Sequence, residues 1–139
     1  MDNRFSSDSF RLMATPEAPR LARHRVSSAC HGLDDELRSV AELLTSELVT
    51  NALRHPPRDE SDPGVEIEVK VRRTDQALRI EVFDHDSRPL PQVETPDASS
   101  EGGMGLYLVE ELSAAWGAQP LTSGAGKVVW FEIGSPDDG

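Results

Sequence analysis

The sequence predicts a single domain of the α+β class, in which helices and antiparallel pairs of strands both occur. Three observations predict it. Apolar residues recur with helical spacing over residues 37–52. Apolar and polar residues alternate strictly over residues 65–72, and again over residues 78–82, as in the two strands of a hairpin. A second pair of short runs flanks Gly124-Ala125-Gly126 near the end of the 139-residue chain.

The first ordered elements are predicted to be a short edge strand and a helix. Residues 10–14 alternate apolar and polar side chains, which favours a strand. Thr15-Pro16-Glu17 is a helix start, because Thr can cap free N–H groups and Pro is tolerated in the first helical position. This helix is predicted to end near Cys30, before His31-Gly32.

The second helix is predicted to start at Asp34 or Asp35 and to end before Pro56-Pro57. An aspartate there can cap the helix and suits the positive end of its dipole. The prolines end the helix, because proline disfavours helical geometry in the residue before it. The apolar positions that follow the helical spacing are Leu37, Val40, Ala41, Leu44, Leu48 and Ala52.

Residues 65–71 and 78–83 are predicted to form a hairpin, joined by a turn at Thr74-Asp75-Gln76. The next segment, residues 84–103, is rich in proline and acidic residues and has little periodicity. A loop of this length inside a compact domain is usually functional.

The last elements are predicted to be a third helix and a closing hairpin. Helical spacing begins at Leu106, and the helix is predicted to end near Trp116-Gly117. Residues 121–123 and 127–133 then form the two strands of the hairpin.

Composition excludes several classes of protein. Fourteen Lys and Arg face 25 Asp and Glu, and the net charge of −11 disfavours binding to nucleic acid or to an anionic membrane. One cysteine, Cys30, excludes a disulfide scaffold and a cysteine zinc site. No apolar run approaches the roughly 18 residues that span a bilayer, so we expect a cytoplasmic protein. We expect one domain over residues 10–133, with a disordered tail over residues 1–9 and an acidic tail over residues 134–139.

Three local features can carry chemistry. Glu47 and Asn51 are one turn apart at the rim of the apolar face of the second helix, where they could face a ligand cleft or remain ordinary near-surface residues. The segment Glu101-Gly102-Gly103-Met104-Gly105-Leu106 opens a helix, as a phosphate-binding loop or a flexible cap would. Asp84 ends a strand, where it could accept a hydrogen bond from a ligand amine or simply start a turn.

Together these features resemble the GHKL ATPase superfamily and, within it, the small bacterial anti-sigma-factor serine/threonine kinases, whose domain is of the histidine-kinase-like ATPase type. The resemblance covers about residues 10–133. Its most specific parts are residues 47–52 with His55, and residues 101–110. It implies a two-layer α/β sandwich of the Bergerat type, with helices on one face of a mixed, mostly antiparallel sheet. ATP would lie between the sheet, the second helix and a lid formed by about residues 86–102.

The resemblance also implies roles for single residues. Asn51 matches the Mg²⁺ ligand, Glu47 the general base and Asp84 the residue that reads adenine. The loop next to the phosphates is matched by Gly103, Met104, Gly105 and Leu106. Arg54 and Arg88 are candidates for contact with the terminal phosphate.

The sequence departs from the family pattern in three places. Asp84-His85-Asp86-Ser87 lacks the glycine that usually follows the adenine-reading aspartate by two residues. Ser99-Ser100-Glu101 stands where the kinases often carry an arginine, and Val128 stands where many relatives have threonine. Binding of ATP is therefore expected more firmly than transfer of its phosphate.

The resemblance leaves three functions open. The first is a serine/threonine protein kinase that binds a sigma factor and phosphorylates an anti-anti-sigma protein. The second is a non-catalytic adapter whose bound nucleotide regulates the capture of a partner. The third, which we favour least, is the detached ATPase domain of a histidine kinase.

The family often forms homodimers through its first strand and helix, which correspond here to residues 10–29.

Other residues have plainer interpretations. Cys30, Trp116 and Trp130 are expected to be buried side chains rather than parts of a site.

Overall fold

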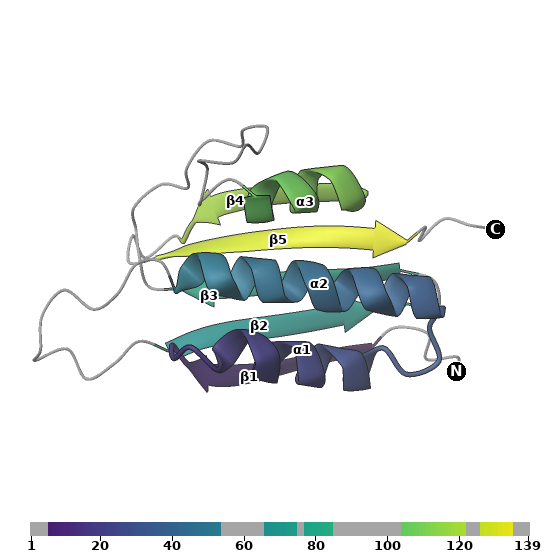
Figure 1. Cartoon of the computed structure of the whole chain (residues 1–139), viewed down its shortest axis with the longest axis horizontal. Coiled ribbons are helices and arrows are strands. Elements are labelled where there is room, and N and C mark those ends of the chain that lie inside the picture. The colour runs from purple at the N-terminus through teal and green to yellow at the C-terminus, as the bar shows by residue number, and fades with distance from the viewer. Residues whose placement is uncertain (1–5, 54–65, 75–76, 85–103, 122–125, 135–139) are drawn as a thin grey trace, which may run out of the picture.

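The computed structural model describes residues 6–53, 66–74, 77–84, 104–121 and 126–134. Their elements are β1 (Ser6–Met13), α1 (Ala18–Ala29), α2 (Asp35–Ala52), β2 (Glu66–Arg73), β3 (Ala77–Asp84), α3 (Met104–Leu112), β4 (Ala115–Pro120) and β5 (Lys127–Gly134). The strands form one sheet in the order β1-β2-β3-β5-β4. Every pair of described neighbours is antiparallel. The helices cover one face of the sheet (Figure 1), which confirms the predicted two-layer α+β sandwich.

The N-terminal elements differ from the prediction at their starts. β1 begins at Ser6, four residues earlier than expected, because the backbone of residues 6–9 pairs with β2 although these side chains do not alternate. The predicted helix cap at Thr15 is wrong. The N–H of Ala18 donates to the carbonyl of Thr15 at 2.9 Å in a turn, and Glu17 occupies the cap position of α1. Residues 6–9 thus belong to β1 and not to a disordered tail. The division into one domain and two tails otherwise stays a prediction.

The start of α2 follows the prediction closely. Of the two candidate caps, Asp34 is the cap, and its Oδ2 accepts hydrogen bonds from the N–H groups of Glu36 at 3.1 Å and Leu37 at 3.3 Å. Asp35 and Glu36 then lie in the first turn, where their charge suits the helix dipole. A well-capped start fixes where the long helix enters the fold.

The C-terminal part contains a strand where the sequence predicts the end of a helix. The third helix ends at Leu112, and Trp116 and Gly117 belong to β4. β4 therefore replaces residues 121–123 as the partner of β5 in the closing hairpin. Trp116 follows Leu112 by four residues and so continues the helical repeat, but in β4 it lies opposite Phe131 across the ladder. Cross-strand packing overrides the short helical pattern here.

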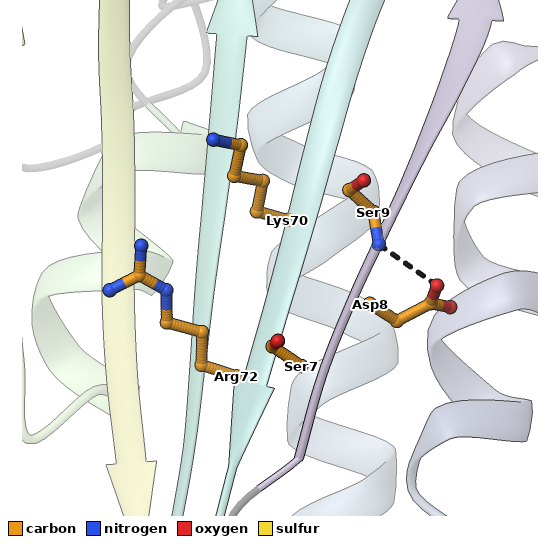
Figure 2. Close-up of a pocket in the computed structure, with 5 residues that line it drawn as sticks. All are labelled: Ser7, Asp8, Ser9, Lys70 and Arg72. Atoms are coloured by element: carbon orange, nitrogen blue, oxygen red, sulfur yellow. Dashed lines mark hydrogen bonds between the residues drawn. The ribbon is translucent and has the colours of Figure 1, made fainter.

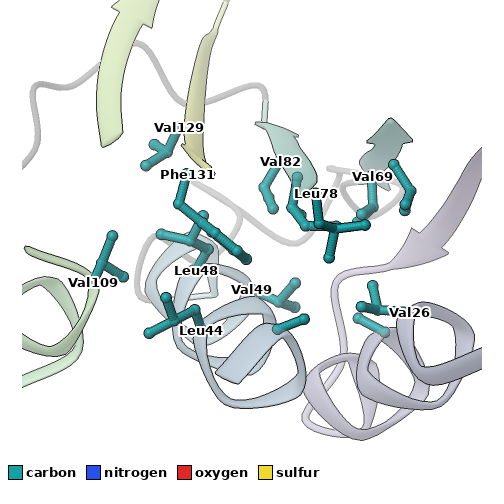
Figure 3. Packing of buried hydrophobic residues seen from close by; sticks show 14 of the residues in the cluster. Val26, Leu44, Leu48, Val49, Val69, Leu78, Val82, Val109, Val129 and Phe131 are labelled. Carbon is teal, nitrogen blue, oxygen red and sulfur yellow. The ribbon is translucent and has the colours of Figure 1, made fainter. Parts of the chain in front are cut away.

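The core lies between the sheet and the helices (Figure 3). Leu44 and Leu48 of α2 pack below Phe131 of β5, while Val26 of α1 lies near Val69 of β2. All of these side chains are at most 2% exposed. Each such side chain contributes about 1.5–3 kcal/mol by leaving water. The aliphatic rows of the sheet thus hold α1 and α2 in place.

The opposite face of the sheet carries polar and aromatic side chains. The prediction that Trp130 is a core residue is wrong, because Trp130 alternates with the buried Val129 and Phe131 and lies on this open face. The guanidinium of Arg79 lies 4.1 Å from the centre of the Trp130 ring. Trp116, by contrast, packs partly against the core as expected.

Cys30 is fully buried, as predicted. Burial raises the pKa of its thiol, although the positive charge of Arg73 opposes the shift. None of the described helices is both long and apolar enough to cross a membrane.

Gly117 of β4 leaves room for the ring of Trp130, its neighbour on β5. A Cβ atom at this position would lie 2.9 Å from Cζ2 of Trp130. We expect Gly117→Ala to lower the free energy of unfolding by about 1–2 kcal/mol, because the indole ring must move. Chemical denaturation measures this difference. In a Trp130→Leu background the same substitution should lower the free energy of unfolding very little, since the ring is gone. An equal loss in both backgrounds would contradict this explanation.

Candidate functional site

The predicted site residues that the structure describes gather at one edge of the domain. α2 and β3 both end at this edge, and β5 begins there (Figure 1). Asp84 is the last residue of β3 and lies directly opposite Lys127, the first residue of β5. α2 also contacts β3, β5 and α3. Elements that are far apart in the sequence therefore meet at a common edge.

Glu47 and Asn51 lie in the last two turns of α2. Leu44 and Leu48 point into the core, so residues 47 and 51 fall together on the neighbouring flank of the helix. Asn51 is only 8% exposed, whereas Glu47 is half-buried. Within the described part of the chain, neither the amide of Asn51 nor the carboxylate of Glu47 has a hydrogen-bond or ion-pair partner. Both groups are therefore available to a ligand, the amide oxygen as an acceptor and the carboxylate as an acceptor or base.

Asp84 is held by a cation that the sequence analysis missed. The Nζ of Lys127 lies 3.3 Å from Oδ1 of Asp84, and the two residues are 5% and 4% exposed. The alternation of inward and outward residues along the strands could have identified Lys127 from the sequence. Asp84 follows the buried Val82 by two residues, and Lys127 precedes the buried Val129 by two. Both charges therefore occupy inward positions at strand ends, where each needs a partner.

The beginning of α3 supplies the third part of the edge. The helix starts at Met104, so Gly105 and Leu106 lie in its first turn, where N–H groups have no partner within the helix. Such an end attracts anions. The side chain of Leu106 is 1% exposed and belongs to the core. Only the backbone of Leu106 could therefore contribute to a ligand site.

Several predicted residues cannot be placed. Arg54, Arg88 and Gly103 lie outside the described residues, as do the predicted lid at about 86–102 and His55. For Met104 and Gly105 only the helical backbone is described.

The described groups form a set with a definite chemistry. An amide oxygen is a suitable ligand for a hard cation. A carboxylate one helical turn away can act as the base that deprotonates a nucleophile. A buried carboxylate can accept a hydrogen bond from an amine, and the N-terminus of a helix can bind an anion. This donor set suits a ligand with an amine at one end and phosphate groups with a divalent cation at the other.

Comparison with protein families agrees with this chemistry. Residues 12–133 match the family described as "Histidine kinase-like ATPase domain". The match extends from β1 to β5 and contains every described residue of the candidate site. No curated protein matches the chain.

The buried pair at this edge should matter for folding. We expect Lys127→Met to lower the free energy of unfolding by about 3–5 kcal/mol, because a buried carboxylate loses a cation that it contacts. Chemical denaturation at neutral pH measures the loss.

Arg38→Met provides a matched control. Arg38 pairs with Asp35 at 3.0 Å, but both side chains are well exposed, at 42% and 89%. We expect this substitution to cost at most about 1 kcal/mol. Equal losses in the two variants would show that burial does not strengthen the pair at Lys127.

Proposed function

The chain belongs to the family of histidine kinase-like ATPase domains, and on this premise we propose that it binds ATP with Mg²⁺ at the edge where α2, β3, β5 and α3 meet. The observation that carries the proposal is the pair of buried polar residues at this edge. Asn51 and Asp84 are 8% and 4% exposed, which is unusual for residues without a structural or ligand-binding role. Phosphate groups would lie near the start of α3.

Each end of the nucleotide has a counterpart. The carboxylate of Asp84 accepts a hydrogen bond from the amine of adenine, and Lys127 keeps that carboxylate in place. The amide oxygen of Asn51 is the protein ligand for Mg²⁺, which otherwise takes phosphate oxygens and water. The loop formed by Gly103, Met104, Gly105 and Leu106 offers backbone N–H groups to the phosphates, so the site needs little positive charge. Arg54 and Arg88 are proposed to contact the terminal phosphate.

For activity, we propose a serine/threonine protein kinase of the anti-sigma-factor type. Glu47 is half-buried, one helical turn from Asn51, and has no ion pair with another described residue. A carboxylate in that position can take the proton of an attacking hydroxyl group. The phosphorylated partner would be an anti-anti-sigma protein, and a sigma factor would be the bound regulator. A basic patch on the sigma factor would complement the net charge of −11.

A non-catalytic adapter is the second candidate. Asp84 is followed by His85, Asp86 and Ser87, without the glycine of the family pattern. Ser99-Ser100-Glu101 replaces the region in which the kinases often carry arginine. These departures leave nucleotide binding intact in principle but remove groups that assist phosphate transfer.

Two further proposals concern assembly and location. We propose a cytoplasmic protein that forms a homodimer through β1 and α1. β1 lies at an edge of the sheet, so one side of its backbone is not paired with a described strand. An unpaired edge is a natural site for association.

Calorimetric titration with ATP tests the binding proposal. We expect the wild type to bind ATP more tightly in the presence of Mg²⁺ than in its absence. Asn51→Ala should remove this difference, because the amide oxygen contacts the cation. Thr50→Ala, one residue away on α2, is the control and should still bind ATP more tightly with Mg²⁺ than without it. Binding by wild type that does not respond to Mg²⁺ would contradict the role of Asn51, and no binding at all would remove the proposed site.

Glu47→Gln separates the two candidate activities. If the chain is a kinase, this variant should transfer phosphate to a serine or threonine of a partner at least about a hundredfold more slowly, because the amide cannot accept the proton. Its affinity for ATP should stay within about threefold of wild type, since the two side chains have the same shape. Transfer that survives in Glu47→Gln contradicts the general-base role, and a wild type that binds but never transfers supports the adapter.

A further inference from the structure

Two leucine side chains are exposed where α2 and α3 lie side by side (Figure 1). Leu43 of α2 is 37% exposed, and Leu112, the last residue of α3, is 44% exposed. Because α3 begins at the edge where α2 ends, the two helices run in opposite directions, and the end of α3 lies beside the first half of α2. That half extends from Asp35 to Leu43. The two leucines therefore belong to one part of the helix layer.

Helical spacing places both leucines beside the contact between α2 and α3. Figure 3 shows Val109 of α3 on the Leu44 side of α2, whereas Val49 lies on the side of α1. Successive residues of a helix are about 100° apart, so Leu43 lies on the opposite side of Leu44 from Val49 and thus toward α3. Leu112 follows Val109 by three residues and lies on nearly the same side of α3. Both leucines therefore border the line along which the two helices pack, on its solvent side.

The apolar surface between the two helices continues from the core to the solvent. Val40 and Leu108 are half-buried and pack against the core. Val40 is one turn before Leu43, and Leu108 is one turn before Leu112. A single exposed leucine needs no explanation, but apolar surface that is contiguous across two elements marks an interaction site.

The charges on the open face of the sheet balance around β2. The outward residues of this strand are Glu66, Glu68, Lys70 and Arg72, two of each sign. Figure 2 shows Lys70 and Arg72 extending from β2 toward β3 and β5. There Glu81 of β3 lies directly opposite Lys70 in the ladder and 3.8 Å from Arg72. Opposite charges are thus interspersed on this face.

The helix layer, by contrast, is divided into a basic and an acidic part. α1 carries three arginines and no acidic residue, whereas α3 carries Glu110 and Glu111 and no cation. α2 and its cap carry five acidic residues and one arginine, Arg38, which pairs with Asp35 at 3.0 Å. Glu36, Glu110 and Glu111 are exposed and form no ion pair with another described residue. Uncompensated negative charge therefore surrounds the two exposed leucines.

We propose that this α2–α3 surface, formed by Leu43 and Leu112 with Glu36 and Glu111 beside them, binds a basic amphipathic helix of a partner protein. Such a helix has apolar side chains at every third or fourth position and cations on the flanks of that stripe. Its apolar stripe would cover the two leucines, and its lysines and arginines would pair with the glutamates. A second copy of the chain bound through the same surface would instead bring the acidic helices of both copies together.

The surface is distinct from the nucleotide edge. Glu47 and Asn51 lie in later turns of α2 and take no part in it. The proposal thus goes beyond the proposed function, and it holds whether or not the chain binds ATP. Asn51→Ala separates the two, because it should change the response of ATP binding to Mg²⁺ and leave binding of the helix unchanged.

Amide NMR titration with a model peptide tests the surface. The first probe is a peptide of about 18 residues with leucines at helical spacing on one face and lysines and arginines on the others. A second probe carries glutamates in place of every cation, and a third has the composition of the first in an order without helical periodicity. We expect saturable shifts around Leu43, Glu111 and Leu112 with the first peptide, and at least about tenfold weaker binding of the other two.

A pair of double variants tests the apolar contact. Leu43→Ser with Leu112→Ser should weaken binding of the basic peptide by at least about tenfold, because both apolar anchors are lost. Met13→Ser with Leu21→Ser is the matched control, since these side chains are 49% and 39% exposed on β1 and α1. It should leave the affinity within about twofold. Thermal unfolding of each variant shows that it is folded before it is titrated.

A second pair tests the charge. Glu36→Gln with Glu111→Gln should weaken binding by about threefold to tenfold at low salt, and added sodium chloride should reduce this difference. Glu66→Gln with Glu68→Gln changes the net charge equally but lies on the open face of the sheet, and should leave the affinity within about twofold.

Four results would overturn the proposal. One is the absence of saturable shifts at about 1 mM of the basic peptide. Another is equal binding of the basic and acidic peptides, and a third is an equal loss in a double variant and its matched control. The fourth is a dimer in sedimentation that Leu43→Ser with Leu112→Ser dissociates, which would assign the surface to a second copy of the chain.

Discussion

The packing of α2 across the centre of the sheet is the constraint on which the rest of the structure depends. Leu44, Leu48 and Val49 bury themselves against the strands, and Phe131 fills the space above them (Figure 3). Because these contacts set both the position and the rotation of the helix, they also set where the polar flank of α2 lies. Glu47 and Asn51 are brought to the edge at which β3 ends and β5 begins. The apolar core thus positions the groups that are proposed to bind nucleotide.

The two faces of the sheet have different chemical uses because only one is covered by helices. Among the described residues of the covered face, fully buried charge occurs at the strand ends, where Asp84 and Lys127 pair. On the open face, charge is plentiful and is balanced by pairs such as Arg79 with Glu81. The proposed nucleotide edge therefore uses a few preorganised polar groups.

Much of this arrangement could be predicted from the sequence, and the exceptions have physical causes. The α2 periodicity, the Asp34 cap and the hairpin of β2 and β3 depend on local patterns, and the structure confirms them. β4 was missed because its strand character comes from pairing with β5, not from its own residues. Lys127 was missed because its partner, Asp84, is 43 residues away. Local patterns therefore predict elements well, but they do not reveal pairs that only the sheet register brings together.

A crystal structure of the chain with Mg²⁺ and a non-hydrolysable ATP analogue tests the central claim most directly. The claim is that the burial of α2 assembles a nucleotide site from Asn51 and Asp84. We expect the cation at about 2.1 Å from the amide oxygen of Asn51, the adenine amine at the carboxylate of Asp84 and the phosphates at the start of α3. A nucleotide bound on the open face of the sheet, or one that contacts neither Asn51 nor Asp84, would contradict it.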